Sequence, residues 1–235
     1  MMYSKQLGVK DMKVSTGFKV VDDVTGGLAL GHTLSIAGRS ASGKSSLATQ
    51  IAANLAKQGL VVGIIDPERS TQTISNNICK QIQGLDDMST ISSSCEFAKL
   101  YPKYIKPLNV ETPDLKNIME LVKRIKFDDK LALFDAIVID NIMLTTDDSW
   151  FFMHKFKQFL YNCNLIGIIT HNISRNGFAY VPGTQQYINS TSDISITIGD
   201  NELTVGNNMY NNHPNVITAP YVLDKATRTF TEVII

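Results

Sequence analysis

The chain has 235 residues, of which 43% are hydrophobic. This is enough for one sizeable core of the kind found in single α/β domains. Lys and Arg together number 22, as do Asp and Glu, so the formal net charge is zero. The strongly basic balance that points to a nucleic-acid partner is therefore absent, although a neutral total permits a local basic patch.

Cysteines and apolar runs bear on the location of the protein. Cys79, Cys95 and Cys163 are odd in number and form no CxxC or Cys/His spacing, which favours reduced thiols in the cytosol. There is no run of about 18 apolar residues to predict a transmembrane helix. The N-terminus MMYSKQLGVKDMKV lacks the apolar core of a signal peptide. We expect a cytoplasmic protein, in a cell or in an infected host, with no membrane partner.

Up to residue 170 the chain alternates apolar runs, typical of buried strands, with segments whose apolar residues recur at helical spacing. Residues 84–104 are less regular, and the serines at 92–94 indicate a surface loop. Apolar strands that alternate with helices predict an α/β fold, mainly a parallel sheet with helices on both faces. The strands are expected at 33–37, 61–66, 136–140 and 165–170, and the helices at 44–58, 71–84, 113–127 and 148–162.

The pattern changes after residue 190, where short strand-like pieces predict an antiparallel C-terminal extension of the same sheet. DKATR, residues 224–228, is typical of a hairpin turn. Residues 1–13 are polar and too short for a domain, so we expect an N-terminal arm and a single domain over 14–235. The strand-like pieces are 193–199, 202–207, 214–219, 220–224 and 229–234.

The stretch GRSASGKSS reads G-x-x-x-x-G-K-S from Gly38 to Ser45, the pattern of a phosphate-binding P-loop, between a predicted strand and a predicted helix. Glycines let backbone N–H groups curl around phosphate oxygens, and the helix N-terminus adds a partial positive charge. Lys44 can reach the β- and γ-phosphates, and the Ser45 hydroxyl can bind Mg²⁺. The alternative, a glycine-rich turn with a chance lysine, does not account for the flanking strand and helix. The expected nucleotide-binding residues are Gly38, Arg39, Ser40, Ala41, Ser42, Gly43, Lys44, Ser45 and Ser46.

Carboxylates at strand ends supply the remaining chemistry. Asp140 ends an apolar strand, and parallel α/β sheets bind their ligands at the carboxyl ends of strands. Asp140 is therefore predicted to hold Mg²⁺ together with Ser45. Glu68 follows another strand in GIIDPER and is the candidate for polarising the attacking water. A solvated loop glutamate is the alternative for Glu68.

Three segments resemble the RecA family of ATPases. STGFKVVDDVTGGLALGHTLSIAG is similar to the family's segment before the P-loop, IIDPER to its second strand, and IITHNIS to the strand whose polar tip senses the γ-phosphate. The resemblance implies a RecA-like P-loop NTPase core with ATP and Mg²⁺ as cofactors. It implies catalytic roles for Lys44 and for Glu68 as the base, and a sensor at His171 or Asn172. The resemblance is strongest to phage recombinases of the UvsX type, and the DnaB helicase motor is similar too.

The same resemblance implies a mobile DNA-contacting loop after the sensor strand, SRNGFAYVPG at residues 174–183. Arg175 offers charge for a phosphate, and Phe178 and Tyr180 offer aromatic faces for stacking. This combination binds single-stranded DNA without sequence preference. The alternative is a loop packed on its own domain or on a neighbouring subunit.

RecA-family proteins form a ring or filament in which a Lys or Arg from the next subunit reaches the ATP. Asn211, Asn212 and His213 stand where this resemblance would place those cations. The cation is then missing or comes from Lys225 or Arg228. Such a residue is worth orders of magnitude in rate, so its absence predicts slow hydrolysis.

Three hypotheses follow. The first is an ATPase of RecA type that binds single-stranded DNA as a homo-oligomer and acts with other recombination or replication proteins, as in phages. The second is a hexameric helicase motor of the DnaB type. The third is a nucleotide-switched assembly or regulatory protein with little turnover.

Overall fold

The computed structural model describes residues 13–83, 96–101, 103–110, 114–127, 134–142, 149–173, 188, 191–207 and 215–233. Residues 1–12 of the predicted arm, the serines at 92–94 and Cys95 lie outside the described residues. So do the predicted DNA-contacting loop at 174–183, with Arg175, Phe178 and Tyr180, and the Asn-Asn-His stretch at 211–213.

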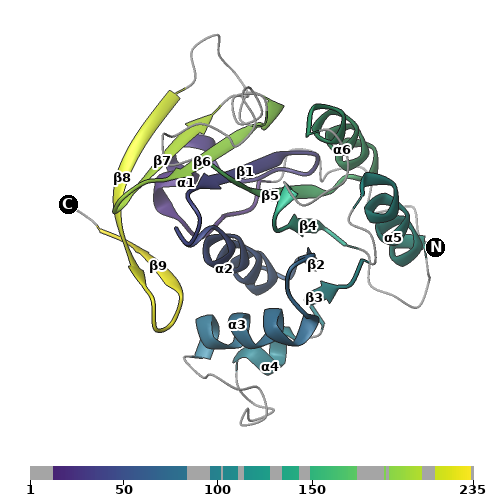
Figure 1. Ribbon diagram of the computed structural model, residues 1–235, viewed down its shortest axis with the longest axis horizontal. Coiled ribbons are helices and arrows are strands. Elements are labelled where there is room, and N and C mark those ends of the chain that lie inside the picture. The colour runs from purple at the N-terminus through teal and green to yellow at the C-terminus, as the bar shows by residue number, and fades with distance from the viewer. Residues whose placement is uncertain are drawn as a thin grey trace.

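A nine-stranded sheet forms the centre of the molecule, in the order β3-β2-β4-β5-β1-β6-β7-β8-β9 (Figure 1). The strands from β3 to β6 pair in parallel, and β6 to β9 pair antiparallel. This confirms the predicted parallel sheet with an antiparallel C-terminal extension. The strands are β1 (Thr33–Gly38), β2 (Val62–Ile65), β3 (Ile105–Leu108), β4 (Ala136–Ile139), β5 (Ile166–Asn172), β6 (Ile194–Ile198), β7 (Glu202–Asn207), β8 (Asn215–Asp224) and β9 (Thr229–Glu232).

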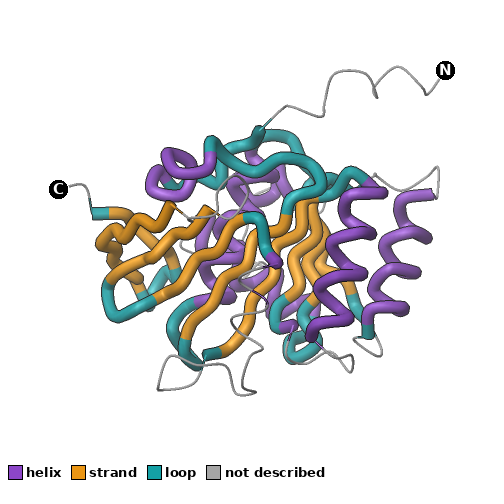
Figure 2. Tube along the Cα trace, turned by 90° about the horizontal axis from the view of Figure 1, so that it is seen from above, coloured by secondary structure: helices purple, strands orange, loops and turns teal. Residues whose placement is uncertain are grey.

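Helices cover both faces of the sheet. The helix after β1, α2, packs on the parallel strands and on β9. α3 lies beside α2, and α4 packs against α3, whereas α5 and α6 pack together and α6 contacts β5 (Figure 1). The view from above shows the twisted strands between these helices (Figure 2). The helices are α1 (Lys19–Thr25), α2 (Lys44–Lys57), α3 (Thr71–Gln83), α4 (Glu96–Leu100), α5 (Leu115–Phe127) and α6 (Ser149–Cys163).

Side chains of the central strands alternate between two apolar cores. In β4, Ala136 and Val138 belong to the core under α2, and Ile137 and Ile139 belong to the core under α6. Because successive side chains of a strand point to opposite faces, an unbroken apolar run serves both cores. A Cβ at Gly167 in β5 would lie 2.3 Å from Leu160 Cδ1, so this glycine lets α6 approach the sheet.

Some elements differ from the sequence expectation. α4 forms within residues 84–104, the segment predicted to be irregular, and neither β3, which directly follows that segment, nor the short helix α1 was predicted. The pieces expected at 214–219 and 220–224 form one strand, β8. Pro220 marks the place where β8 changes partner, because β8 pairs with β7 up to this residue and with β9 beyond it. A proline has no N–H to donate, so such a boundary suits it.

Candidate nucleotide site

The P-loop lies where the sequence predicted it, between the end of β1 at Gly38 and the start of α2 at Lys44. Two residues of the loop have left-handed backbone conformations, Ala41 with φ 62° and Gly43 with φ 96°. A Cβ at Gly43 would also lie 2.7 Å from Phe230 Cζ of β9. The glycine is therefore required both by the turn and by the packing of the C-terminal hairpin over it.

A cavity of about 330 Å³ opens over the P-loop. Its charged lining residues are all basic, as expected of a site for a polyphosphate. The first turn of α2 lies in this lining, so the N–H groups that a helix leaves without internal partners are available there. The lining residues are Ala41, Gly43, Lys44, Ser45, Ser46, Arg69, Leu223, Lys225 and Arg228.

Lys44 lies buried at the first turn of α2, and its Nζ donates to the carbonyl oxygen of Arg39 at 2.7 Å. Burial lowers the pKa of Lys44, and the charges of Asp140 and Glu68 oppose that change. The structure therefore brings the predicted lysine and both predicted carboxylates into one electrostatic neighbourhood.

Asp140 follows β4 and is buried, and both its carboxylate oxygens have partners. The Thr170 hydroxyl, from β5, donates to Oδ1, and the Arg69 guanidinium pairs with Oδ2. Arg69 also pairs with Asp66, the carboxylate after β2. Burial raises the pKa of the Asp66 carboxyl, and the Arg69 charge opposes this rise.

Sequence reasoning did not assign site roles to Asp66, Arg69 and Thr170. Asp66 and Thr170 are polar residues in or just after apolar strands at the ligand-binding edge of the sheet, and that position is a usable signal. The pairing of Arg69 with Asp140 depends on how close β2 and β4 lie, and no sequence pattern predicts it. Asp66 fixes the turn that carries Arg69, because its Oδ1 accepts the backbone N–H groups of Glu68 at 2.9 Å and Arg69 at 3.1 Å.

The other predicted residues differ in their relation to the cavity. Glu68 is exposed on this turn. In β5, alternation places Asn172 on the same face as Thr170, toward the P-loop, and the fully buried His171 on the opposite face. Asn172 pairs in register with Gly38. Gly38, Arg39, Ser40 and Ser42 do not line the described cavity, and the Arg39 side chain lies 3.8 Å from Asp200 at the surface.

Lys225 and Arg228, which the sequence offered as cations for a neighbouring subunit, line the cavity of their own chain. Hydrogen bonds of Gln81 connect the β8–β9 turn that carries them to α3, which holds Gln81, and to α2. The Gln81 side-chain amide donates to the carbonyl oxygens of Ser46 and Arg228, both at 2.8 Å. The chain therefore supplies basic groups to its own site.

The residues present fit Mg²⁺ bound together with a nucleotide. Mg²⁺ in such sites takes one or two protein ligands and relies on phosphate oxygens and water for the rest. Ser45 lines the cavity, and Asp140 pairs with Arg69, which lines the cavity as well. Among the described residues, no group of three or more His, Cys, Asp or Glu side chains could hold a metal alone. Within the described ranges, the buried Ser42 Oγ of the P-loop has no hydrogen-bond partner.

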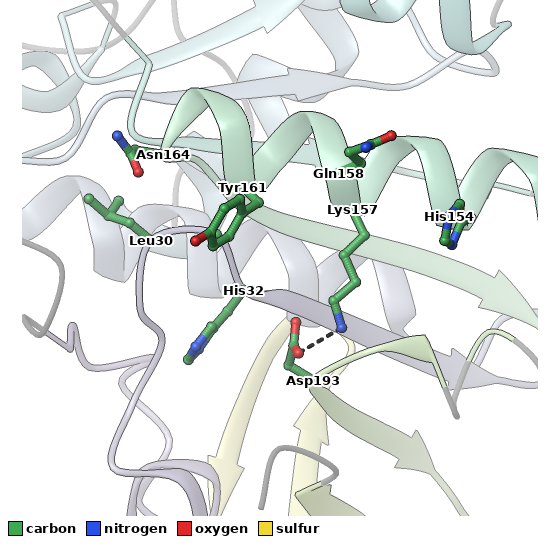
Figure 3. A pocket seen from close by; sticks show the side chains of 9 residues that line it. Leu30, His32, His154, Lys157, Gln158, Tyr161, Asn164 and Asp193 are labelled. Atoms are coloured by element: carbon green, nitrogen blue, oxygen red, sulfur yellow. Dashed lines mark hydrogen bonds and ion pairs between the residues drawn. The ribbon is translucent and has the colours of Figure 1, made fainter.

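A second cavity, of about 580 Å³, lies at the opposite edge of the sheet (Figure 3). His32 and Asp193, which line it, precede β1 and β6, so it lies at the amino ends of these strands. Asp193 accepts hydrogen bonds from Thr33 N and Oγ1, both at 2.8 Å, and pairs with Lys157 of α6 at 2.7 Å. These contacts join two strands and a helix, which is a structural role.

The sheet order, the P-loop cavity and the polar strand ends define a P-loop nucleotide-binding protein of RecA-like fold. A family model, the DnaB-like helicase C-terminal domain, matches residues 13–156, more than half of the chain. The chain therefore belongs to the DnaB-like helicase C-terminal domain family.

Solved structures support the fold. A structure described as an ATPase domain matches with a TM-score of 0.77 and 14% identity, over 98% of this chain and 94% of that chain. A DnaB-like replicative helicase, described with its interactions with primase, matches with a TM-score of 0.71 and 15% identity. That match covers 93% of this chain and 61% of the helicase. No curated protein sequence matches this chain.

None of the helices in the described ranges is long and apolar enough to cross a membrane.

Proposed function

We propose that this protein is the ATP-hydrolysing motor domain of a DnaB-type helicase, acting in replication on single-stranded DNA as a homo-oligomeric ring. The observation that carries the proposal is a basic cavity over a P-loop in a chain of the DnaB-like family. The sequence analysis gave the helicase motor only as its second hypothesis, after a RecA-type ATPase resembling the UvsX recombinases. The comparisons favour the helicase motor.

The proposed roles follow from the positions of the side chains. Lys44 neutralises the β- and γ-phosphate charge from inside the cavity. Ser45 and Asp140 hold Mg²⁺, whose charge would stabilise the phosphates. Glu68, whose charge acts on Lys44, accepts a proton from the attacking water. Asn172, on the P-loop face of β5, is favoured over His171 as the sensor of the γ-phosphate.

The DNA-contacting role stays with the loop at 174–183. Arg175 would bind a phosphate, and Phe178 and Tyr180 would stack on bases. β5, which precedes this loop, contributes Asn172 beside the P-loop. A response of Asn172 to the nucleotide would therefore pass directly into the DNA-contacting segment.

ATP hydrolysis with and without single-stranded DNA tests the function. We expect turnover that rises with DNA, is lost in Glu68→Gln, and is accompanied by ATP-driven strand displacement. Lys44→Ala should bind ATP much more weakly, and unchanged affinity would contradict the site assignment. Tight binding with negligible turnover, and an oligomer that changes size with ATP in light scattering, would instead indicate a nucleotide-switched assembly protein.

A further inference from the structure

The Arg69 guanidinium joins two acidic side chains that come from different strand ends. Its Nε pairs with Asp66 after β2, and its NH2 group pairs with Asp140 after β4. Both carboxylates are almost fully buried, with side-chain exposures of 1% for Asp66 and 5% for Asp140. One guanidinium therefore pairs with two buried carboxylates, and a buried carboxylate is costly without such a partner.

Arg69 also lines the nucleotide cavity, together with Lys44 and Lys225. Its side chain lines the cavity and remains 24% exposed. Guanidinium groups bind phosphate oxygens as readily as carboxylates, and often through two parallel hydrogen bonds. Arg69 thus faces two classes of anion at once, the carboxylates beneath it and a polyphosphate above it.

The two contacts of Arg69 differ in how firmly they are held. Asp66 also accepts the backbone N–H groups of Glu68 and Arg69, so it fixes the turn whether or not the side chains pair. The contact with Asp140 is made by one end of the guanidinium alone. A rotation of the Arg69 side chain can therefore release Asp140 while Asp66 keeps the turn in place.

Asp140 is the group for which Arg69 and a metal ion compete. Thr170 occupies Oδ1 and Arg69 occupies Oδ2. A guanidinium on a carboxylate oxygen opposes a divalent cation at the same carboxylate through like-charge repulsion.

We propose that Arg69 is a nucleotide-responsive positioning residue, which pairs with Asp140 before the nucleotide binds and then moves to the phosphates of the bound nucleotide. Its departure exposes Asp140 to the metal, so that nucleotide and metal binding become coupled. This inference rests on the proposed function and adds to it a residue that the P-loop pattern does not contain. It also accounts for a basic side chain directly after the proposed base, Glu68.

The test is the binding of a fluorescent ATP analogue to the full chain, in EDTA and in saturating Mg²⁺. The ratio of the two dissociation constants measures the gain in affinity that Mg²⁺ provides. Arg69→Gln should weaken binding in EDTA, because a cation of the cavity is lost. It should also lower the Mg²⁺ gain by roughly threefold or more, because Asp140 is then open to the metal before the nucleotide binds and the coupling is lost.

Lys225→Gln is the matched control. Lys225 lines the same cavity. Among the described residues, it forms no ion pair with a carboxylate. Its loss should weaken binding in both conditions and leave the Mg²⁺ gain unchanged. In an Asp140→Asn background, Arg69→Gln should no longer alter the gain. If Arg69→Gln does not fold, Arg69→Lys, which keeps the charge without the fork, should show the same change at smaller size.

Each outcome has one meaning. Equal weakening with and without Mg²⁺ in Arg69→Gln would overturn the inference and leave the proposed function intact. A lowered gain that persists in the Asp140→Asn background would also overturn it. Wild-type protein that binds no nucleotide would overturn both the inference and the proposed function.

Discussion

The Gln50 side chain and the Phe230 backbone form a reciprocal pair of hydrogen bonds. Gln50 Nε2 donates to the Phe230 carbonyl oxygen at 3.0 Å, and Phe230 N donates to Gln50 Oε1 at 2.8 Å. Gln50 belongs to α2 and Phe230 to β9, and 180 residues separate them in the chain. One amide therefore fastens the C-terminal hairpin to the helix that carries the P-loop.

Loss of this amide should weaken both stability and nucleotide binding. Gln50→Ala leaves the N–H and carbonyl groups of Phe230 without these partners, which should cost about 2 kcal/mol in the free energy of unfolding. Nucleotide affinity should fall as well, because Lys225 and Arg228 are carried by the loosened hairpin. Urea unfolding and binding of a fluorescent nucleotide measure the two effects. Gln58→Ala, which removes exposed hydrogen bonds to Ser15, is the control and should leave binding unchanged.

Gly43 and Gly59 lie at opposite ends of α2 and provide a matched pair. Both have positive φ, 96° and 87°, but a Cβ at Gly59 would meet nothing within 4 Å, whereas one at Gly43 would meet Phe230 and Leu223. Gly59→Ala should therefore cost about 1 kcal/mol from backbone strain alone. Gly43→Ala should cost more and weaken nucleotide binding by about tenfold or more, because the hairpin must shift. Similar effects of both substitutions in thermal unfolding and binding would show that the hairpin does not press on the P-loop.

Local patterns were sufficient to predict the parallel sheet and the P-loop. The run Ala136–Ile139 is apolar at every position because it serves two cores, and the glycines and lysine of the loop have fixed spacing. The edge strand Ile105–Leu108 was missed because it is short, contains Pro107 and is only partly buried beyond its first residue. Such a strand lacks the apolar run by which buried strands are recognised.

The cavity itself could be predicted only in part. Lys44, Ser45 and Asp140 follow from motif and strand position. The pairing of Arg69 with Asp140 joins residues 71 positions apart, and the approach of Lys225 and Arg228 depends on how the C-terminal hairpin folds back over α2. These contacts arise from sheet order, which hydrophobic periodicity does not encode. The suggestion that Lys225 or Arg228 reaches the ATP of a neighbouring subunit came from the family pattern and stays a prediction; within the chain, both residues line the P-loop cavity.

Asp193 should matter for stability and leave the nucleotide site unaffected. Its carboxylate is largely buried and accepts hydrogen bonds from Thr33 and Lys157. Asp193→Ala should lower the free energy of unfolding by about 2 kcal/mol, with unchanged nucleotide affinity in the protein that remains folded. The control is Asp200→Ala, an exposed carboxylate whose pair with Arg39 is solvated, and which should have little effect. Loss of nucleotide binding in Asp193→Ala alone would assign a functional role to the second cavity.

His32 should make stability depend on pH. Burial lowers the pKa of His32 from its ordinary value of 6.5, with Lys13 and Lys157 acting in the same direction and Asp193 opposing them. The neutral ring is also the form that can accept the Ala29 N–H at Nδ1, over 3.2 Å. Since the folded protein disfavours the protonated ring, the stability that His32 contributes is complete above the unfolded pKa. It is lost as the pH falls through the lower folded pKa.

The free energy of unfolding of the wild-type protein should therefore drop between about pH 7.5 and about pH 5.5 by more than that of His32→Asn. Asn is chosen because its side-chain oxygen can replace Nδ1 as the acceptor for Ala29 without titrating in this range. Carboxylates that begin to protonate near the lower limit affect both proteins alike, so the difference between the two curves isolates the histidine. Above about pH 7.5, where His32 is neutral in both states, the two curves should run parallel. A wild-type loss equal to or smaller than that of the variant would show that burial does not hold this ring neutral.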